Sequence, residues 1–313
     1  SSDAGGQTTL YHECVVFDST DAIFYVKVDL SSTADTVIYF WYGTPAITGT
    51  ESKTNVWTNG ISIYHLESDG TDSLGNHNGT SYNTETGDYA SANGVVGNGV
   101  DLDGSNEYIG WSSYTPDNTI TIMAWVKNDS SGALFPIFAH GGGSGVYGIR
   151  FSLNSTEMQY WPHTSGYWGY SNHGLTDTNF NHYTVTRNGN GNTLAFYANA
   201  TSKIVTYYSG GTISNNARCD YIGYYNAGTA RYANGKVDEV WVFDDVKSSD
   251  FVKVVYNNVQ NYSTFITIDG AVTIGSPPIQ VYPVWPVSST PHTGTVTSGI
   301  GIAAAISTQS DFN

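Results

Sequence analysis

Two adjacent carboxylates, Asp238 and Glu239, lie inside an apolar run. In a regular strand each acid would share its face with apolar side chains: Val240 and Val242 beside Asp238, and Val237, Trp241 and Phe243 beside Glu239. A strand that is apolar on both faces is a buried strand. Because burying an unpaired charge is prohibitive, both carboxylates must be held by hydrogen bonds or by a cation.

A second group of oxygen-bearing side chains lies in the segment DSLGNHNGT, residues 72–80. Asp72, Asn76 and Asn78 supply side-chain oxygens around Gly75, and a hard cation such as Ca²⁺ takes roughly six to eight oxygen ligands. The same spacing also fits an Asx-turn, in which these side chains bond their own backbone. The residues alone leave both readings open.

Aromatic side chains gather in the segment YWPHTSGYWGY, residues 160–170. Its rings are those of Tyr160, Trp161, Tyr167, Trp168 and Tyr170. Sugars are recognised by stacking on aromatic ring faces together with polar side chains that bind the hydroxyls. We therefore predict a glycan-binding surface here, to which Tyr224, Tyr225 and Tyr232 could add. The alternative is that alternate residues of one strand fill a core.

The composition indicates what kind of secondary structure positions these residues. The chain has 313 residues, of which 14% are aromatic and 12% charged, so it predicts ordered material rich in strands and turns. Eleven basic against 27 acidic residues give a formal charge of −16, which argues against nucleic acid or anionic membranes as partners. The sequence contains no run of about 18 apolar residues, the length that would predict a membrane-spanning helix. We expect an extracellular, cell-surface or virion-surface protein.

Three regions follow from the pattern along the chain. Residues 1–60 contain a few strands, predicted at Tyr11–Phe17, Ala22–Leu30 and Thr36–Tyr42. Residues 61–262 carry short strands separated by turns, the spacing of a β-sandwich, and end in a short helix that begins at Ser248 or Ser249. Residues 263–313 form a Pro-, Thr- and Ser-rich extension with short β-like pieces.

Six segments of the middle region occur in the order of a known family. They are Ile61–Thr80, Leu102–Ile109, Ile120–Lys127, His182–Ala200, Tyr221–Asn226 and Gly235–Tyr256. Together they resemble the laminin-G-like domains of the concanavalin A-like lectin/glucanase superfamily. The resemblance implies an all-β fold, an antiparallel β-sandwich (jelly roll) with one short helix. It also implies a structural Ca²⁺ in the Asp72 loop, with Asp238 completing the shell.

The N-terminal region resembles part of another domain. Residues 25–60 are similar to the end of a small β-domain of unknown function that commonly precedes laminin-G-like domains in surface and phage proteins. Residues 1–18 match only the middle of that domain, so we expect this unit to be truncated, proteolysed or completed by another chain. The start at Ser1 without Met leads us to expect an upstream piece.

An enzymatic role is not predicted. Glucanases of the superfamily carry paired carboxylates on one strand face as E-x-D-x-x-E or close variants, and no predicted strand of this chain carries that pattern. Asp238 and Glu239 are neighbours expected to point to opposite faces, and Asp244 and Asp245 fall in a turn. The eight histidines lack zinc-type spacing, and no nucleophile motif accompanies His140.

The sequence thus predicts a surface protein for adhesion or recognition, which binds a glycan or a surface protein without catalysis. The alternative is a structural protein of a capsid, tail or cell-surface filament that acts as a homo-oligomer or within a larger particle. Incomplete strand edges in the N-terminal region and the extended C-terminal segment favour that alternative. Cys14 and Cys219 could pair or stay free.

Overall fold

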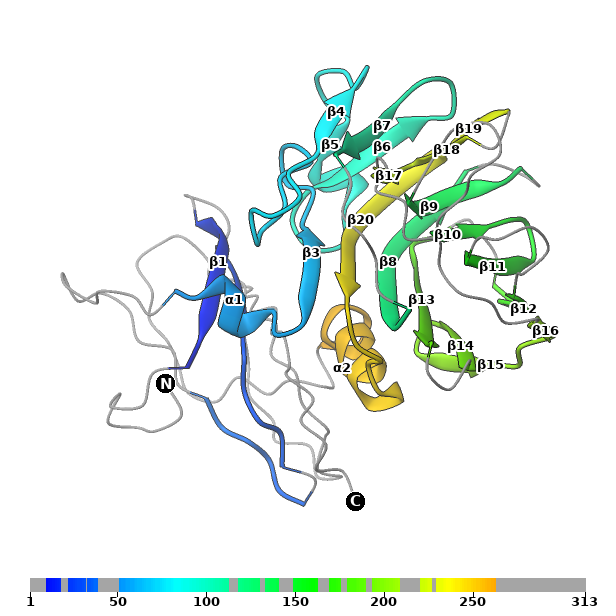
Figure 1. Cartoon of the computed structure of the whole chain (residues 1–313). Coiled ribbons are helices and arrows are strands. Elements are labelled where there is room, and N and C mark those ends of the chain that lie inside the picture. Colours follow the sequence, from blue (N-terminus) through cyan, green and yellow to red (C-terminus); the bar gives the residue numbers. More distant parts are fainter. Residues whose placement is uncertain are drawn as a thin grey trace. The chain divides into compact units, whose positions relative to one another are not determined.

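The computed structural model describes twelve stretches of the chain, which form two compact units (Figure 1). The described residues are 10–17, 22–31, 33–38, 51–112, 118–129, 133–140, 149–162, 169–175, 179–189, 193–208, 220–226 and 229–262. The first unit comprises Ser1–Thr58 and Asp250–Asn313, and the second comprises Asn59–Ser249. The predicted C-terminal extension, residues 263–313, lies outside the described residues.

The first unit contains a two-stranded antiparallel ribbon of β1 (His12–Phe17) and β2 (Ala22–Val26) and the short helix α1 (Lys53–Val56). The predicted strand Ala22–Leu30 therefore ends at Val26, and of Thr36–Tyr42 the described residues 36–38 are not in a strand. Helix α2 (Ser249–Gln260) is the predicted terminal helix.

The first unit contains a buried acid, Glu13, that is held by a hydrogen bond and an ion pair. Glu13 is 1% exposed, accepts a hydrogen bond from the Trp57 indole N–H, and has the Lys53 Nζ at 3.3 Å from its Oε1. Cys14 carries a free thiol, whose pKa is raised to about 11 by burial and by nearby Glu51 and Glu13. Cys219 lies outside the described residues.

The second unit is built on two antiparallel sheets, which we name after a central strand of each. The β10 sheet has the order β16 (Tyr207–Tyr208), β12 (Gly169–Asn172), β11 (Glu157–Pro162), β10 (Ile149–Leu153), β9 (Phe135–His140), β17 (Asp220–Ile222), β7 (Tyr108–Trp111), β4 (Thr80–Tyr82). The β8 sheet has the order β15 (Thr201–Lys203), β14 (Thr193–Ala198), β13 (Asn181–Asn188), β8 (Ile120–Asn128), β20 (Asn234–Phe243), β6 (Gly99–Asp103), β5 (Tyr89–Ala90), with β3 (Gly60–Tyr64) also paired to β20. A separate hairpin joins β18 (Tyr224–Asn226) to β19 (Ala230–Tyr232), and a 3-10 turn covers Ser91–Asn93. The predicted all-β sandwich is confirmed.

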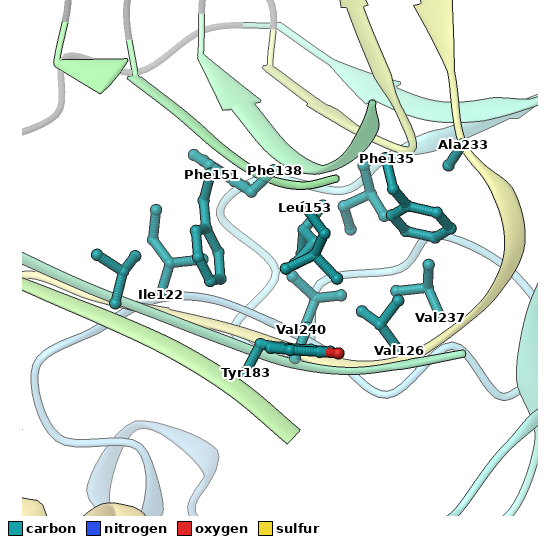
Figure 2. Close-up of a cluster of buried hydrophobic side chains, with 14 of the residues drawn as sticks. Ile122, Val126, Phe135, Phe138, Phe151, Leu153, Tyr183, Ala233, Val237 and Val240 are labelled. Carbon is teal, nitrogen blue, oxygen red and sulfur yellow. The ribbon is translucent and has the colours of Figure 1, made fainter. Parts of the chain in front are cut away.

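The hydrophobic core of this unit lies between the two sheets (Figure 2). Ile149, Phe151 and Leu153 of β10 all belong to it, and the Phe151 ring stacks on that of Phe196 with centroids 6.5 Å apart. Side chains alternate along a strand, so burying these three residues turns the residues between them to the outer face. The strand thereby presents Arg150 on the outside of the sandwich.

Strand β20 departs from the regular alternation that the sequence analysis assumed. Val237, Val240 and Val242 all lie in the core, which places Asp238 away from Val240. Asp238 pairs with Trp125 of β8 and Trp241 pairs with Met123, so three steps on one strand match two on the other. This is a β-bulge, and Glu239 takes the left-handed backbone conformation with φ +50°. The predicted face assignment was wrong for Val237 and Asp238, because one inserted residue reverses the alternation before Val240, whereas Glu239 and Trp241 do share a face as predicted.

We expect His182 of β13 to make folding sensitive to acid. It pairs with Trp125, is 1% exposed, and burial lowers its pKa to about 3 from an ordinary 6.5. The unfolded chain therefore binds a proton that the folded chain excludes, so this stability is fully present above pH 6.5 and is lost as the pH falls towards 3. Urea unfolding of the wild type and of His182→Phe between pH 7.5 and 4 should give a flatter pH dependence for the variant. Equal losses in the two proteins would contradict this account.

Candidate functional site

The outer face of the β10 sheet carries a row of aromatic side chains. The strand register brings them together: Tyr82 of β4 lies opposite Tyr108 of β7, and Arg150 of β10 lies opposite Trp161 of β11. Tyr170 of β12 lies opposite Gln159, two residues from Trp161 and on the same face. This set, together with the tyrosines described next, is called the aromatic face below.

The ring of Tyr108 is the centre of a tyrosine cluster. Tyr82 stacks on it at 4.6 Å between centroids and Tyr224 at 4.9 Å, while Tyr221 meets it edge-on at 5.6 Å. Tyr232 packs on Tyr224 at 5.0 Å. The arrangement joins hairpin β18–β19 to β4, β7 and β17, so residues far apart in sequence form one surface.

Gly110 makes room for this cluster. It lies on the outer face of β7 opposite Tyr221, and a Cβ there would stand 3.1 Å from the Tyr221 ring and 3.2 Å from the Tyr108 ring. Such distances are tighter than ordinary van der Waals contact, so a larger residue would push the two rings apart.

Next to the tyrosines, Arg150 lies between two further rings. Its guanidinium carbon is 4.6 Å from the Trp161 ring centroid and 4.8 Å from that of Tyr225. Its Nη2 donates to Gln159 Oε1 at 3.1 Å. Burial and the nearby positive charge of Arg231 lower the pKa of Arg150 to about 10, so it remains charged at neutral pH.

The structure divides the predicted glycan-binding residues. Trp161 and Tyr170 lie on the aromatic face, and Tyr167 and Trp168 lie outside the described residues. Tyr160 points into the sandwich and is fully buried, so its ring face cannot meet a sugar; this part of the prediction was wrong, and the alternative of a core residue holds. Of the three tyrosines expected to add to this surface, Tyr225 shares Arg150 with Trp161, whereas Tyr224 and Tyr232 pack in the cluster around Tyr108.

The predicted metal ligands occupy two separate hydrogen-bonded places. Asp72 accepts four backbone N–H groups, from Ile63, Leu74, Asn76 and His77, at 2.9 to 3.1 Å. Asn78 Oδ1 accepts the N–H of Asp72 at 3.1 Å. This is the backbone-bonding arrangement that the sequence left open, and it uses both carboxylate oxygens of Asp72.

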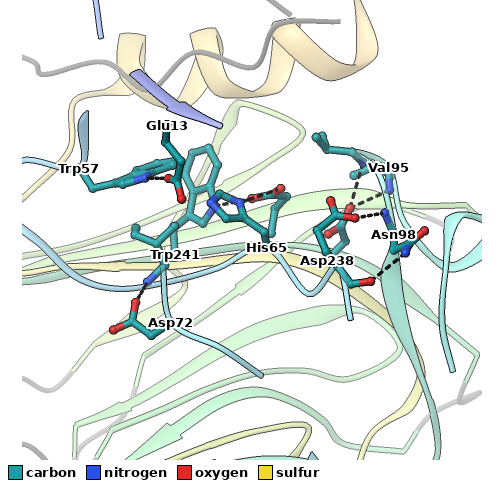
Figure 3. A network of polar contacts seen from close by, with 12 residues as sticks. Glu13, Trp57, His65, Asp72, Val95, Asn98, Asp238 and Trp241 are labelled. Carbon is teal, nitrogen blue, oxygen red and sulfur yellow. Dashed lines mark hydrogen bonds and ion pairs between the residues drawn. The ribbon is translucent and has the colours of Figure 1, made fainter. Parts of the chain in front are cut away.

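Asp238 is held by a different loop (Figure 3). The N–H groups of Val95 and Val96 donate to its Oδ2 at 2.7 and 3.0 Å, and the N–H of Asn98 donates to Glu67 Oε2 at 2.9 Å. Burial and the neighbouring Glu239 carboxylate raise the pKa of Asp238 well above its usual value. Its Oδ1 is buried and has no hydrogen-bond partner within the described residues.

Glu239 is neutralised separately, on the outer side of the β8 sheet. Its Oε2 accepts from His65 Nδ1 at 2.8 Å and from the Trp241 indole N–H at 2.6 Å. Glu239 is 2% exposed and Asp238 is fully buried. The expectation that buried carboxylates would be held by hydrogen bonds or a cation is therefore met by hydrogen bonds at both acids.

A Ca²⁺ ion fits these residues only in part. The oxygens of Asp72 are already used, and the described residues contain no cluster of three His, Cys, Asp or Glu side chains that could hold a metal. The buried Oδ1 of Asp238 is the one predicted ligand atom that a cation would satisfy. We therefore retain Ca²⁺ as a proposal at Asp238, where backbone carbonyls and water would supply the other ligands.

His140 is hydrogen-bonded to Asp220 inside the sandwich. The two side chains are 1% and 0% exposed, and Nδ1 of the histidine contacts Oδ1 of the aspartate. Each lies two residues from a core side chain in its strand, His140 from Phe138 in β9 and Asp220 from Ile222 in β17. The pair stabilises the interior.

Arg150 and His65 were not predicted as site residues. A local signal for Arg150 existed, since alternation in residues 149–153 turns it outward and the tight connection to β11 places it opposite Trp161. His65 has no comparable signal, because it meets Glu239 only through the pairing of β3 with β20, 174 residues apart in sequence.

Comparison with known proteins finds a lectin-like family match that spans most of the second unit. Residues 103–253 match the family model described as the concanavalin A-like lectin/glucanases superfamily. No curated protein sequence matches the chain.

Solved structures resemble the chain in fold at low identity. Domain 4 of AbnA, an extracellular GH43 arabinanase from Geobacillus stearothermophilus, in complex with arabinotriose, is 18% identical with a TM-score of 0.49, covering 62% of this chain and 97% of that one. Trypanosoma rangeli sialidase in complex with the inhibitor DANA is 13% identical (TM-score 0.46, 63% of this chain and 32% of that one). The botulinum neurotoxin serotype D binding domain is 12% identical (TM-score 0.49, 68% and 54%).

The chain thus spans about a third of the sialidase and about half of the neurotoxin domain. These distant likenesses assign neither a ligand nor an activity to it.

We expect calcium to stabilise the protein through Asp238. Wild-type protein in millimolar Ca²⁺ should melt at a higher temperature than in excess chelator. When free Ca²⁺ is a hundredfold above its Kd, the free energy of unfolding should rise by about 2.7 kcal/mol. Asp238→Asn should abolish this response, because the amide carries no charge for the ion. Asp72→Asn is the matched control and should retain the response. Calorimetric melting curves that are identical in calcium and chelator would remove the metal, and loss of the response in Asp72→Asn would move it to the loop.

Proposed function

Since residues 103–253 belong to the concanavalin A-like lectin/glucanases superfamily, we propose that this protein is a recognition module that binds a glycan, without catalysis, through the aromatic face of its β10 sheet. The binding surface comprises Tyr82, Tyr108, Tyr170, Tyr221, Tyr224, Tyr232 and Trp161. The partner is a glycan on a cell or surface protein.

The observation that carries the proposal is that the rings of the tyrosine cluster around Tyr108 are packed against one another and yet partly exposed. Tyr82 is 43% exposed and stacks directly on Tyr108. Rings held by their neighbours lose little conformational freedom when a ligand binds, and their faces suit the apolar faces of sugar rings. Gln159 and Glu157, joined at 3.1 Å, lie at the same end as Trp161 and supply polar groups for hydroxyls.

The absence of catalysis is part of the proposal. The acids that the sequence singles out, Asp238 and Glu239, are at most 2% exposed and accept hydrogen bonds from the protein itself. Glycoside hydrolysis needs two carboxylates that reach the scissile bond with a gap set by the mechanism. Buried acids that are engaged with Val95, His65 and Trp241 favour a structural role.

We propose that the protein acts outside the cell, at a cell surface or on a virion surface. The strongly acidic composition and the lectin-like fold support this placement. In the described part of the chain, no helix is both long and apolar enough to cross a membrane.

A role in an assembly is the second candidate, and the β1–β2 ribbon favours it. Phe17 is 68% exposed and Tyr11 is 48% exposed, at or beside the ends of β1. Two-stranded ribbons are marginal by themselves and gain stability from added strands. Pairing with another copy or with a neighbouring structural protein would cover these side chains.

We expect a glycan array to give reproducible binding that depends on the aromatic face. Tyr232→Ala and Tyr170→Ala should each weaken binding by about tenfold, because truncating a stacking ring removes a central contact. Tyr262→Ala is the matched control, since Tyr262 is a 54% exposed tyrosine just beyond the end of α2, and it should bind like the wild type.

The competing outcomes separate the two candidates. No binding to any glycan, together with a stable higher-order species by size-exclusion light scattering, would favour the assembly role. Binding that is unchanged in both face variants would show that sugars are recognised elsewhere on the protein.

A further inference from the structure

Arg150 is a buried cation without a counter-charge in the described part of the chain. Its side chain is 8% exposed and lies between the rings of Trp161 and Tyr225. The groups that accept its hydrogen bonds, the Gln159 amide oxygen and the Tyr225 hydroxyl, are neutral. Its Nε is buried and has no hydrogen-bond partner within the described residues.

Several lysines of the described residues stand next to a carboxylate, which Arg150 does not. Five lysines stand 2.9 to 3.3 Å from a carboxylate: Lys53, Lys127, Lys236, Lys247 and Lys253. No ion pair within the described residues involves Arg150 or Arg231. With 27 acidic and only 11 basic residues in the sequence, a counter-charge would have been easy to supply.

Arg231 adds a second positive charge at the same place. It is exposed, lies opposite Tyr225 in the β18–β19 hairpin, and is close enough to Arg150 to depress the pKa of that guanidinium, although burial depresses it more. Two arginines that repel each other are costly unless an anion lies between or beside them. Stacking on two rings offsets part of this cost but leaves Nε without an acceptor within the described residues.

We propose that Arg150 and Arg231 bind the anionic group of an acidic saccharide, a carboxylate or a sulfate carried by a sugar that stacks on the aromatic face. The inference rests on the proposed glycan binding and specifies its ligand class. The planar guanidinium donates through Nε and its terminal nitrogens to oxyanions, and Trp161 and Tyr225 hold it in a fixed plane. Exposed Arg231 at the surface meets the anion first, and Arg150 lies beneath it.

The test compares oligosaccharides that differ only in charge. Isothermal titration of the full chain with galactose, galacturonic acid and sulfated galactose oligomers of equal length should give at least about tenfold tighter binding for an acidic oligomer than for the neutral one. Whichever of the two acidic oligomers binds more tightly identifies the anion. The preference should weaken as salt is raised.

Three variants assign the preference to the arginines. Arg231→Gln, at an exposed position, should reduce the acidic-over-neutral ratio by about tenfold while leaving neutral binding unchanged. Arg150→Lys should reduce the ratio as well, because lysine keeps the charge but lacks the planar donor set. Lys253→Gln removes an exposed cation from α2 and should leave the ratio as in the wild type.

Outcomes against the inference are distinct from failure of the proposed function. Equal affinity for neutral and acidic oligomers, or a ratio that Arg231→Gln does not change, overturns the inference and leaves glycan binding intact. Binding to poly-glutamate but to no acidic sugar also overturns it. Absence of binding to every sugar removes both proposals.

Discussion

Burial of the apolar inner faces of two antiparallel sheets is the constraint on which the rest of the structure depends. Once Ile149, Phe151 and Leu153 enter the core, the intervening Arg150 must point outward. The antiparallel pairing of β10 with β11 then places Trp161 directly opposite Arg150. Tyr170 and Tyr221 are placed on the outer face by the same reasoning, because their neighbours in the strand are buried.

This constraint also explains how much the sequence could predict. The sandwich and the terminal helix follow from local alternation and spacing, and so does the aromatic character of residues 160–170. The inward direction of Tyr160 could have been predicted from its neighbour Met158, since both share one face of β11 and both are fully buried. The tyrosine cluster around Tyr108 could not, because it needs the hairpin β18–β19 to lie against β7, which no local pattern encodes.

The bulge in β20 shows where alternation fails. One extra residue between Asp238 and Trp241 turns Val237 and Val240 to the same face, so a strict period of two assigns Asp238 wrongly. Placing Glu239 at φ +50° costs of order 1 to 3 kcal/mol, which the surrounding contacts must offset. The carboxylate bonds to His65 and Trp241 offset this cost, and both need the folded sheet to be in place.

The buried acids and the buried arginine of the second unit therefore differ in whether the chain itself satisfies their hydrogen-bonding groups. Glu239 has its donors within the chain, as does Asp72, so these acids contribute to stability and need nothing further. Arg150 has aromatic faces on both sides but a donor without an acceptor. Buried polar groups in folded proteins are nearly always satisfied, so an unsatisfied one on an aromatic surface indicates a partner from outside the chain. Packed rings beside a preoriented cation suit the proposed ligand, which is apolar on one face and negatively charged at one edge.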